Sequence, residues 1–426
     1  MTPVELSRTV LRAVRRAVED GELSVVVPDA VSVTVPGAGG SGDYATNIAL
    51  QLARPAGESP RRVAELLLPH LADARGVSGV EITGPGFLNI RLGSTASTAL
   101  VAEILRRGPR YGFVDDPVIN ESQVNEPASD GPFSDGLAIG NHTRRDTRPL
   151  RLHAPYEPRA LVVLDVVARL LRSQGIRVQT GSEESPSPEP VWAATLGVAG
   201  GDSYRAPQES TGLDEPTGLA EPTHFDVRPL PVPTPDLPAL LALGPDAARW
   251  ALLLPAGHDR PRLTTEHLVQ REANPLFRVR YAYARTRAVS RNAADLGFTA
   301  EPGDVRGTPN TRDARDAQDT GNGRDAQNVR NTRPAPADPH HLTLTPLLAD
   351  HPRVLSRAAA HRAPDLLARH LVAVADAVLP LLSAVLPLGD EKPLAAHRAR
   401  LALAEAAGAV LAGGLSLLGI DAPEHL

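Results

Sequence analysis

The first 110 residues alternate between helix-like and strand-like patterns of apolar and polar positions. Leu6, Val10 and Val14 recur at helical spacing behind Pro3, which predicts an amphipathic first helix. Further along we expect strands over residues 31–35, 80–82 and 87–92, and helices over residues 59–74 and 94–107. This mixture predicts a small α/β domain over residues 1–110.

A single strand–helix–strand pattern follows in the middle of the chain. Residues 150–153 and 176–179 have the pattern of short strands, and residues 158–173 between them have the apolar spacing of a helix. Residues 181–238 then hold eleven prolines among acidic, serine, threonine and glycine residues. Such a stretch buries too little apolar surface to offset its ordering entropy, so we expect a linker there.

Helical spacing returns over residues 245–298 and again over residues 342–426, which predicts an all-α unit within residues 241–426. Residues 299–340 separate these two parts. They include the near-repeat RDARDAQDTGNGRDAQNVRN, and valine is the only aliphatic residue larger than alanine among them. We interpret residues 299–340 as a disordered insertion.

Composition narrows the chemistry available to the chain. Cysteine is absent, which excludes disulfides, zinc–cysteine sites, iron–sulfur clusters and cysteine nucleophiles. Lys392 is the only lysine, and the net charge of −6 argues against a wholly basic nucleic-acid coat protein. The start lacks a signal-peptide stretch, and Asp376 and two prolines interrupt the most apolar run, residues 371–388. We therefore expect a cytoplasmic protein without membrane contact.

The segment from Asn274 to Arg291 has the strongest pattern for nucleic-acid binding. Asn274 suits a helix N-cap, and Pro275 suits the first helical position. Five arginines follow, interleaved with three aromatic residues: Arg278, Arg280, Arg285, Arg287 and Arg291, with Phe277, Tyr281 and Tyr283. Guanidinium groups pair with phosphates and aromatic rings stack on unpaired bases, as in recognition of single-stranded RNA loops. The alternative is a solvated basic helix whose aromatic side chains pack into a bundle.

Other site patterns are weak. His340, His341 and His351 suggest a metal, but they border the insertion, and we interpret them as surface histidines. Residues 37–42 form a glycine-rich loop without the spacing or the lysine of a phosphate-binding loop. We therefore predict no catalytic residue, no metal site and no cofactor.

Five segments in order resemble the arginyl-tRNA synthetases. GDYATNIALQLA at residues 42–53 and GPGFLNIRL at residues 84–92 are similar to the N-terminal additional domain of that family. LGPDAARW at residues 243–250 and NPLFRVRYAYAR at residues 274–285 resemble the entry to its anticodon-binding domain. The end, from Gly389-Asp-Glu to GLSLLGIDAPE, resembles the family's C-terminal helices.

This resemblance implies an α/β N-terminal additional domain, a remnant Rossmann-like βαβ segment, and an all-α C-terminal DALR anticodon-binding bundle. The partner it implies is tRNA, most simply arginine tRNA, and neither DNA nor a membrane; a protein partner stays open. The implied tRNA-contacting residues are Asn47 and Gln51 on the tRNA corner, and Asn274, Arg278, Tyr281, Tyr283 and Arg285 at the anticodon loop. The family's glutamine before the tyrosine is Arg280 here, and its common terminal methionine is Leu426.

Residues 118–240, the region of the family's catalytic domain, depart from the family pattern. Synthetases of this family bind ATP with a His-x-Gly-His motif at a strand–helix turn, and that motif occurs nowhere in this chain. Residues 154–157, Ala-Pro-Tyr-Glu, stand in its place, where Glu157 would repel a phosphate and Pro155 lacks a backbone donor. Only 65 residues, largely proline-rich, lie between Gly181 and Pro245. We expect a degenerate catalytic remnant with absent or very weak amino-acid activation.

Two alternatives stay open. The first is an active arginine–tRNA ligase, which would need ATP as a cofactor. The second is a regulatory protein-interaction scaffold that uses the helical end of the chain, for which an exposed apolar face without a basic groove would be the sign. The preferred interpretation is a non-catalytic or weakly catalytic tRNA-binding protein that contacts the anticodon loop and the tRNA corner.

Overall fold

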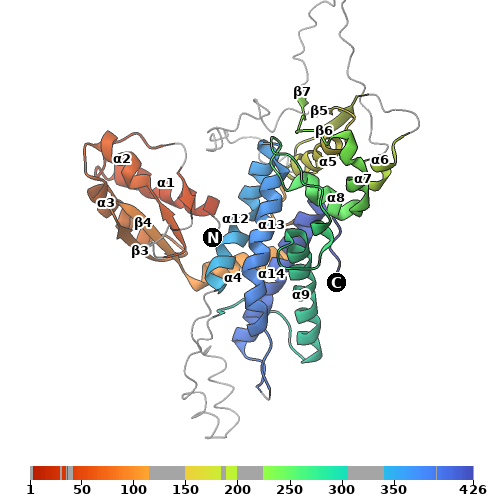
Figure 1. The fold of residues 1–426 in the computed structure, drawn as a ribbon. Helices are drawn as coiled ribbons and strands as arrows, with labels where there is room; N and C mark the ends of the chain where they lie inside the picture. The colour runs from red at the N-terminus through yellow and green to blue at the C-terminus, as the bar shows by residue number, and fades with distance from the viewer. Residues whose placement is uncertain are drawn as a thin grey trace, which may run out of the picture.

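The computed structural model describes residues 3–28, 31–34, 36, 42–114, 149–183, 189–198, 224–305, 340–389 and 391–425. A small N-terminal domain stands beside a larger body, in which a sheet and its helix cap one end of a helical bundle (Figure 1). Helix α4 (Ser94–Arg107) leads from the domain into the body (Figure 1). Most of the predicted insertion, residues 306–339, and residues 115–148 lie outside the described residues.

The N-terminal domain packs three helices against a four-stranded antiparallel sheet. Its elements are α1 (Pro3–Glu19), β1 (Val33–Thr34), β2 (Tyr44–Thr46), α2 (Ile48–Ala56), α3 (Pro60–Ala72), β3 (Val77–Thr83) and β4 (Phe87–Leu92), with strand order β1-β2-β4-β3. Leu6 of α1, Leu67 of α3 and Ile90 of β4 are fully buried in its core. The predicted first helix, the helix at residues 59–74 and the two later strands are confirmed, whereas α2 was not predicted.

Two adjacent glycines let α14 (Ala395–Leu418) approach its neighbours closely. A Cβ at Gly413 would overlap the carbonyl group of Pro109, in the short 3-10 helix η1 (Gly108–Arg110) that follows α4. A Cβ at Gly414 would overlap the side chain of Leu371 on α13 (Pro364–Val378). The link from the N-terminal domain and the core of the body are therefore both packed against one helix.

A three-stranded parallel sheet covers one end of the body. Its strands are β5 (Leu150–Ala154), β6 (Val178–Ser182) and β7 (His224–Asp226), in the order β6-β5-β7. Helix α5 (Pro158–Ser173) connects β5 to β6 and has the predicted bounds. The linker prediction for residues 181–238 is wrong in part, because α6 (Val191–Thr195) and β7 lie within that range. The backbone of β5 supplies the pairing partner that makes the three residues of β7 a strand.

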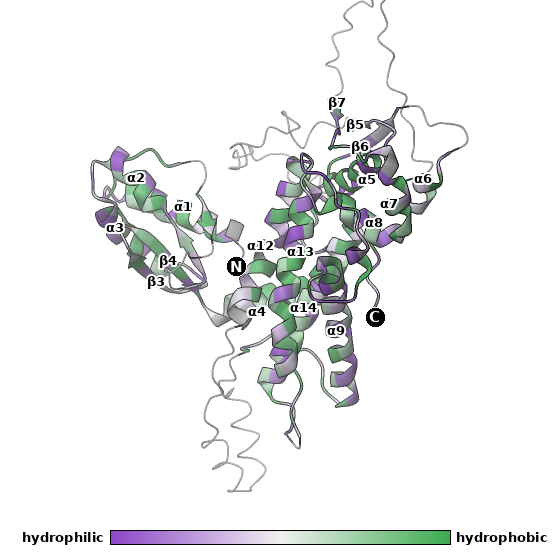
Figure 2. Ribbon diagram, in the orientation of Figure 1, coloured by the Kyte–Doolittle hydropathy of each residue, from purple (hydrophilic) through white to green (hydrophobic). Residues whose placement is uncertain are grey.

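The rest of the body is helical, as predicted. Its elements are η3 (Thr234–Asp236), α7 (Leu237–Ala242), α8 (Gly244–Leu253), η4 (Thr265–Leu268), α9 (Pro275–Asp295), α12 (His340–Ala360), α13, η5 (Leu379–Ala384) and α14. Two stretches, Pro364–Ala384 and Ala395–Leu418, are long and apolar enough to cross a membrane, and 56% and 78% of them are buried inside the molecule. Their apolar residues face the other helices and form the core of the bundle (Figure 2), which accounts for their composition.

A buried arginine, Arg249, links the helices that pack beside the three-stranded sheet to the end of α14. Arg249 of α8 is 3% exposed and donates hydrogen bonds to the carbonyl oxygens of Leu418 and Leu196, at 3.0 and 2.7 Å. It also forms an ion pair with Asp165 of α5 at 2.5 Å. One guanidinium thus joins four helices, and every contact is charge-assisted in a desolvated site.

Candidate RNA-binding surface

The start of α9 is fixed by the predicted N-cap. The Asn274 Oδ1 accepts a hydrogen bond from the Leu276 amide at 3.1 Å. Its Nδ2 donates to the carbonyl oxygens of His267 and Val269, at 2.8 and 3.0 Å. The side chain is buried, at 7% exposure. Asn274 therefore holds the preceding loop against the helix start, and its polar atoms are used by the chain itself.

Four of the five arginines of α9 are paired with acids from distant parts of the chain. The pairs are Arg278 with Asp376 at 2.9 Å, Arg280 with Asp246 and Asp421 at 3.4 and 3.9 Å, and Arg287 and Arg291 with Glu424 at 3.1 and 3.6 Å. These acids come from α8, α13 and the segment that follows α14. Much of the positive charge predicted for α9 is therefore neutralised within the molecule.

Three residues on one side of α9 form what we call the α9 aromatic patch: the half-buried Phe277 and the exposed Tyr281 and Arg285. The Phe277 and Tyr281 rings stack with centroids 5.4 Å apart and an angle of 18° between their planes. Tyr281 is 38% exposed. Arg285, one turn further along, is exposed and makes no hydrogen bond or ion pair with any described residue. A flat aromatic surface beside a free guanidinium is suited to a stacked base and its phosphate.

Other predicted contact residues are placed differently. Tyr283 is half-buried against the core of the body, and burial raises the pKa of its hydroxyl. In the N-terminal domain, Asn47 precedes α2, and Gln51 lies one turn along it. The Gln51 Nε2 donates to the Asn47 Oδ1 at 3.2 Å, and Gln51 is exposed. Asn47 and Gln51 thus present a pair of amide groups at one end of a helix.

The start of α5 follows residues 154–157, which stand in the place of the ATP-binding motif, so its free donors decide whether the chain could bind a nucleoside triphosphate there. The Glu157 carboxylate accepts hydrogen bonds from the amides of Arg159 and Ala160 at 3.2 and 2.9 Å, and from Val232 at 2.8 Å. The amide of Leu161 donates to the Glu157 carbonyl oxygen at 3.0 Å, and Pro158 has no amide hydrogen. Every donor of the first turn is therefore already used. These residues do not fit a triphosphate.

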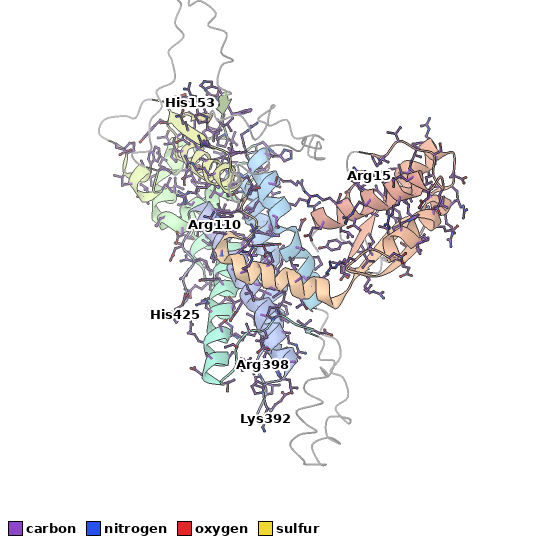
Figure 3. The ribbon with its side chains drawn as sticks, turned by 180° about the vertical axis from the view of Figure 1, so that it is seen from behind. Arg15, Arg110, His153, Lys392, Arg398 and His425 are labelled. Atoms are coloured by element: carbon purple, nitrogen blue, oxygen red, sulfur yellow. The ribbon has the colours of Figure 1, made fainter. Side chains whose placement is uncertain are left out.

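The side chains around that helix start are likewise engaged. Arg159 is fully buried and donates to five backbone carbonyl oxygens, those of Leu230, Leu252, Pro255, Ala256 and Asp259. His153 on β5 lies 3.8 Å from Asp226 on β7. Lys392, the only lysine, lies at the far end of the body from His153 (Figure 3).

The prediction that His351 lies on the surface is wrong. His351 of α12 is 1% exposed and stacks between the rings of Tyr111 and His370, with centroid distances of 6.0 and 5.2 Å. Helix packing buried it, which its position beside the insertion did not indicate. The side chains of His340 and His341 lie outside the described residues. Among the residues that are described, no group of three metal-ligating side chains occurs.

Two family models match the ends of this chain. The arginyl tRNA synthetase N terminal domain matches residues 5–92, and the DALR anticodon binding domain matches residues 279–426. The two ends of the chain are therefore similar to two domains of the arginyl-tRNA synthetases. The second match contains most of the α9 aromatic patch, and the first contains Asn47 and Gln51.

Several proteins that are similar to the chain are named as arginine–tRNA ligases. The ligase of Frankia alni is 44% identical over 117 residues, which are 28% of this chain and 21% of that ligase. The ligase of Renibacterium salmoninarum is 42% identical over 182 residues, 42% of this chain and 30% of that ligase. These two alignments thus span less than a third of the relatives' length. The ligase of Paenarthrobacter aurescens aligns over the whole of both chains at 26% identity, through 580 positions for the 426 residues here.

Solved structures show the same fold. The arginyl-tRNA synthetase of Thermus thermophilus matches all of this chain with a TM-score of 0.54 and 14% identity. That of Plasmodium falciparum matches all of this chain and 99% of its own with a TM-score of 0.57 and 10% identity. The full-length alignment with the Paenarthrobacter aurescens ligase favours the ligase alternative over a non-catalytic protein, whereas the helix start at α5 does not fit ATP.

Proposed function

We propose that this chain is a member of the arginyl-tRNA synthetase family and binds tRNA, with the anticodon loop on the α9 aromatic patch and the corner of the tRNA on the N-terminal domain. The observation that carries the proposal is the stack of the exposed Tyr281 ring on the half-buried Phe277, beside Arg285, which is unpaired among the described residues. Stacking on an aromatic ring accepts any base, while a guanidinium holds the adjacent phosphate. Asn274 contributes by fixing the helix that presents this patch.

Arginine tRNA is the proposed partner, because the relatives are named as arginine–tRNA ligases. The finer proposal is that binding occurs without aminoacylation. It is supported by the Glu157 carboxylate, which takes up the amide donors of α5, and by the missing His-x-Gly-His motif. On this proposal, the parallel sheet of β5, β6 and β7 is a remnant of a Rossmann-type catalytic domain.

An arginine–tRNA ligase is the second candidate, and the full-length alignment with the Paenarthrobacter aurescens ligase favours it. The two candidates share tRNA binding and differ in whether ATP is consumed. ATP–pyrophosphate exchange with arginine and tRNA separates them. Exchange above the background of a heat-treated sample would establish the ligase; exchange at background, with tRNA bound, would support the non-catalytic protein.

A gel shift with arginine tRNA, competed by an unrelated tRNA, tests the shared part of the proposal. Tyr281→Ala should weaken binding by about 5- to 100-fold, since one base–aromatic stack contributes about 1–3 kcal/mol. Arg285→Ala should weaken it as well. Arg287→Ala is the matched control on the same helix, because Arg287 is already paired with Glu424. Equal affinity of Tyr281→Ala and the wild type would place the anticodon loop elsewhere.

A further inference from the structure

Helix α1 has a charged outer face that the site described above does not include. Its inner face, which includes Leu6, Val10 and Val14, is buried in the N-terminal domain. The opposite face carries four exposed arginines, which we call the α1 arginine stripe: Arg8, Arg12, Arg15 and Arg16. They stand four, three and one residues apart, so they follow one side of the helix.

The stripe differs from α9 in that its arginines form no ion pair with an acid among the described residues. Arg8, Arg15 and Arg16 make no hydrogen bond or ion pair with any residue in the described part of the chain. Arg12 donates only to the neutral hydroxyl of Thr9, at 3.0 Å. On α9, by contrast, acids pair with four of five arginines. Within the described residues, four arginines of α1 therefore lack an acidic partner, whereas on α9 only Arg285 does.

The arrangement matches a polyanion with regular charge spacing. Eight residues separate Arg8 from Arg16, which is about 12 Å along a helix. A nucleic-acid strand carries a phosphate about every 3.4 Å of duplex axis, so the stripe is long enough to contact several phosphates in succession. Like charges one turn apart on a helix repel each other, and a bound phosphate backbone would relieve that repulsion.

We propose that the α1 arginine stripe binds the phosphate backbone of the tRNA, a step that rests on the proposed function. Arg15 projects from α1 in the N-terminal domain, outside the helical body (Figure 3). Asn47 and Gln51 are in the same domain, so the stripe supplies the phosphate contacts that position a nucleic acid, and the amide pair supplies contacts to bases. The N-terminal domain then contributes affinity, and its share depends on salt.

RNA fits this face better than an acidic protein does. Protein interfaces have an apolar centre with aromatic and aliphatic anchors. Among the described residues of α1, no large apolar side chain is exposed. Exposed Glu5 and Glu19 stand at the two ends of the stripe, and the four arginines between them leave a face of net positive charge, as is typical of a polyanion-binding surface.

The test compares two quadruple variants in equilibrium binding of labelled arginine tRNA between 50 and 200 mM salt. The stripe variant is R8Q/R12Q/R15Q/R16Q. The matched control removes four exposed arginines from other elements of the same domain and is R54Q/R61Q/R75Q/R91Q. Glutamine has nearly the helix propensity of arginine, and circular dichroism checks that both variants are folded. A stripe variant with lysine at all four positions retains the charge.

The stripe variant should bind at least about tenfold more weakly at 150 mM salt, and its slope of log K against log salt should fall by about 3, because each lost phosphate contact removes about 0.7–0.9. The control and the lysine variant should keep the wild-type slope.

A stripe variant with the wild-type slope, or a control that loses as much tRNA affinity as the stripe variant, would overturn the inference. Polyglutamate and unrelated RNA are also compared as competitors at equal charge. If polyglutamate displaces the bound tRNA as effectively as unrelated RNA does, the assignment of the stripe to RNA would be overturned. Absence of tRNA binding by the wild type would instead reject the proposed function itself.

Discussion

Acidification should destabilise the helical body through a pair of buried histidines. His370 is 8% exposed, and burial lowers its pKa to about 4, against an opposing effect of Asp350. Burial also lowers the pKa of its stacked neighbour His351 well below the usual range. The His351 Nδ1 and the His370 Nε2 have no hydrogen-bond partner among the described residues. Protonation would therefore place an uncompensated charge in the core.

The sign and size follow from linkage. Between pH 6.5 and pH 4 the unfolded chain binds more protons than the folded one, so stability is fully present above about pH 6.5 and falls as the pH drops. For His370 alone, the free energy of unfolding should fall by about 2 kcal/mol between pH 7.5 and pH 5. His351 adds to this in the same direction.

Urea unfolding followed by tryptophan fluorescence measures how the stability of the helical body depends on pH. Trp192 and Trp250 are the two tryptophans of the chain, and both are buried in the core of the body. His370→Leu should reduce the difference in unfolding free energy between pH 7.5 and pH 5 by about 2 kcal/mol. His361→Leu, which removes an exposed imidazole, should leave the difference unchanged. An identical pH dependence in the wild type and His370→Leu would refute the reasoning.

Three further substitutions test the packing that supports the proposed surface. Asn274→Ala removes three hydrogen bonds of the α9 start and should lower the free energy of unfolding by about 1–3 kcal/mol; an unchanged urea midpoint would contradict this. Gly413→Ala should cost about 1–3 kcal/mol, because the new Cβ meets the Pro109 carbonyl, whereas Gly257→Ala, with open space around it, should be close to neutral in the same melt. Arg159→Met leaves five carbonyl oxygens without the donor that the buried guanidinium supplies and should cost at least about 3 kcal/mol by urea unfolding; a loss below 1 kcal/mol would show that water replaces the guanidinium.

Elements with strong local signals were predictable from the sequence. The structure gives α4 and α5 the predicted bounds, Ser94–Arg107 and Pro158–Ser173. For α5, Pro158 stands at the first helical position behind the Glu157 cap, and apolar residues keep helical spacing to the end. The N-cap at Asn274 was predictable for the same local reason.

Elements that depend on distant partners were not predictable. The strand β7 has only three residues in a proline-rich stretch, and pairing with β5 creates it. The charge balance of α9 depends on Asp376, Asp246 and Glu424, which are far from it in sequence. The sequence therefore predicted which residues could form the candidate site. It could not show that Tyr281 and Arg285 are exposed, whereas Arg278 is paired with an acid and Tyr283 is half-buried.

Nuclease footprinting of arginine tRNA bound to this protein tests the central claim most directly. The protein should protect the anticodon loop, through the α9 aromatic patch, and the outer corner, through the N-terminal domain. Tyr281→Ala should remove the first protection and leave the second. A wild-type protein that binds without protecting the anticodon loop, or does not bind arginine tRNA at low salt, would contradict the account.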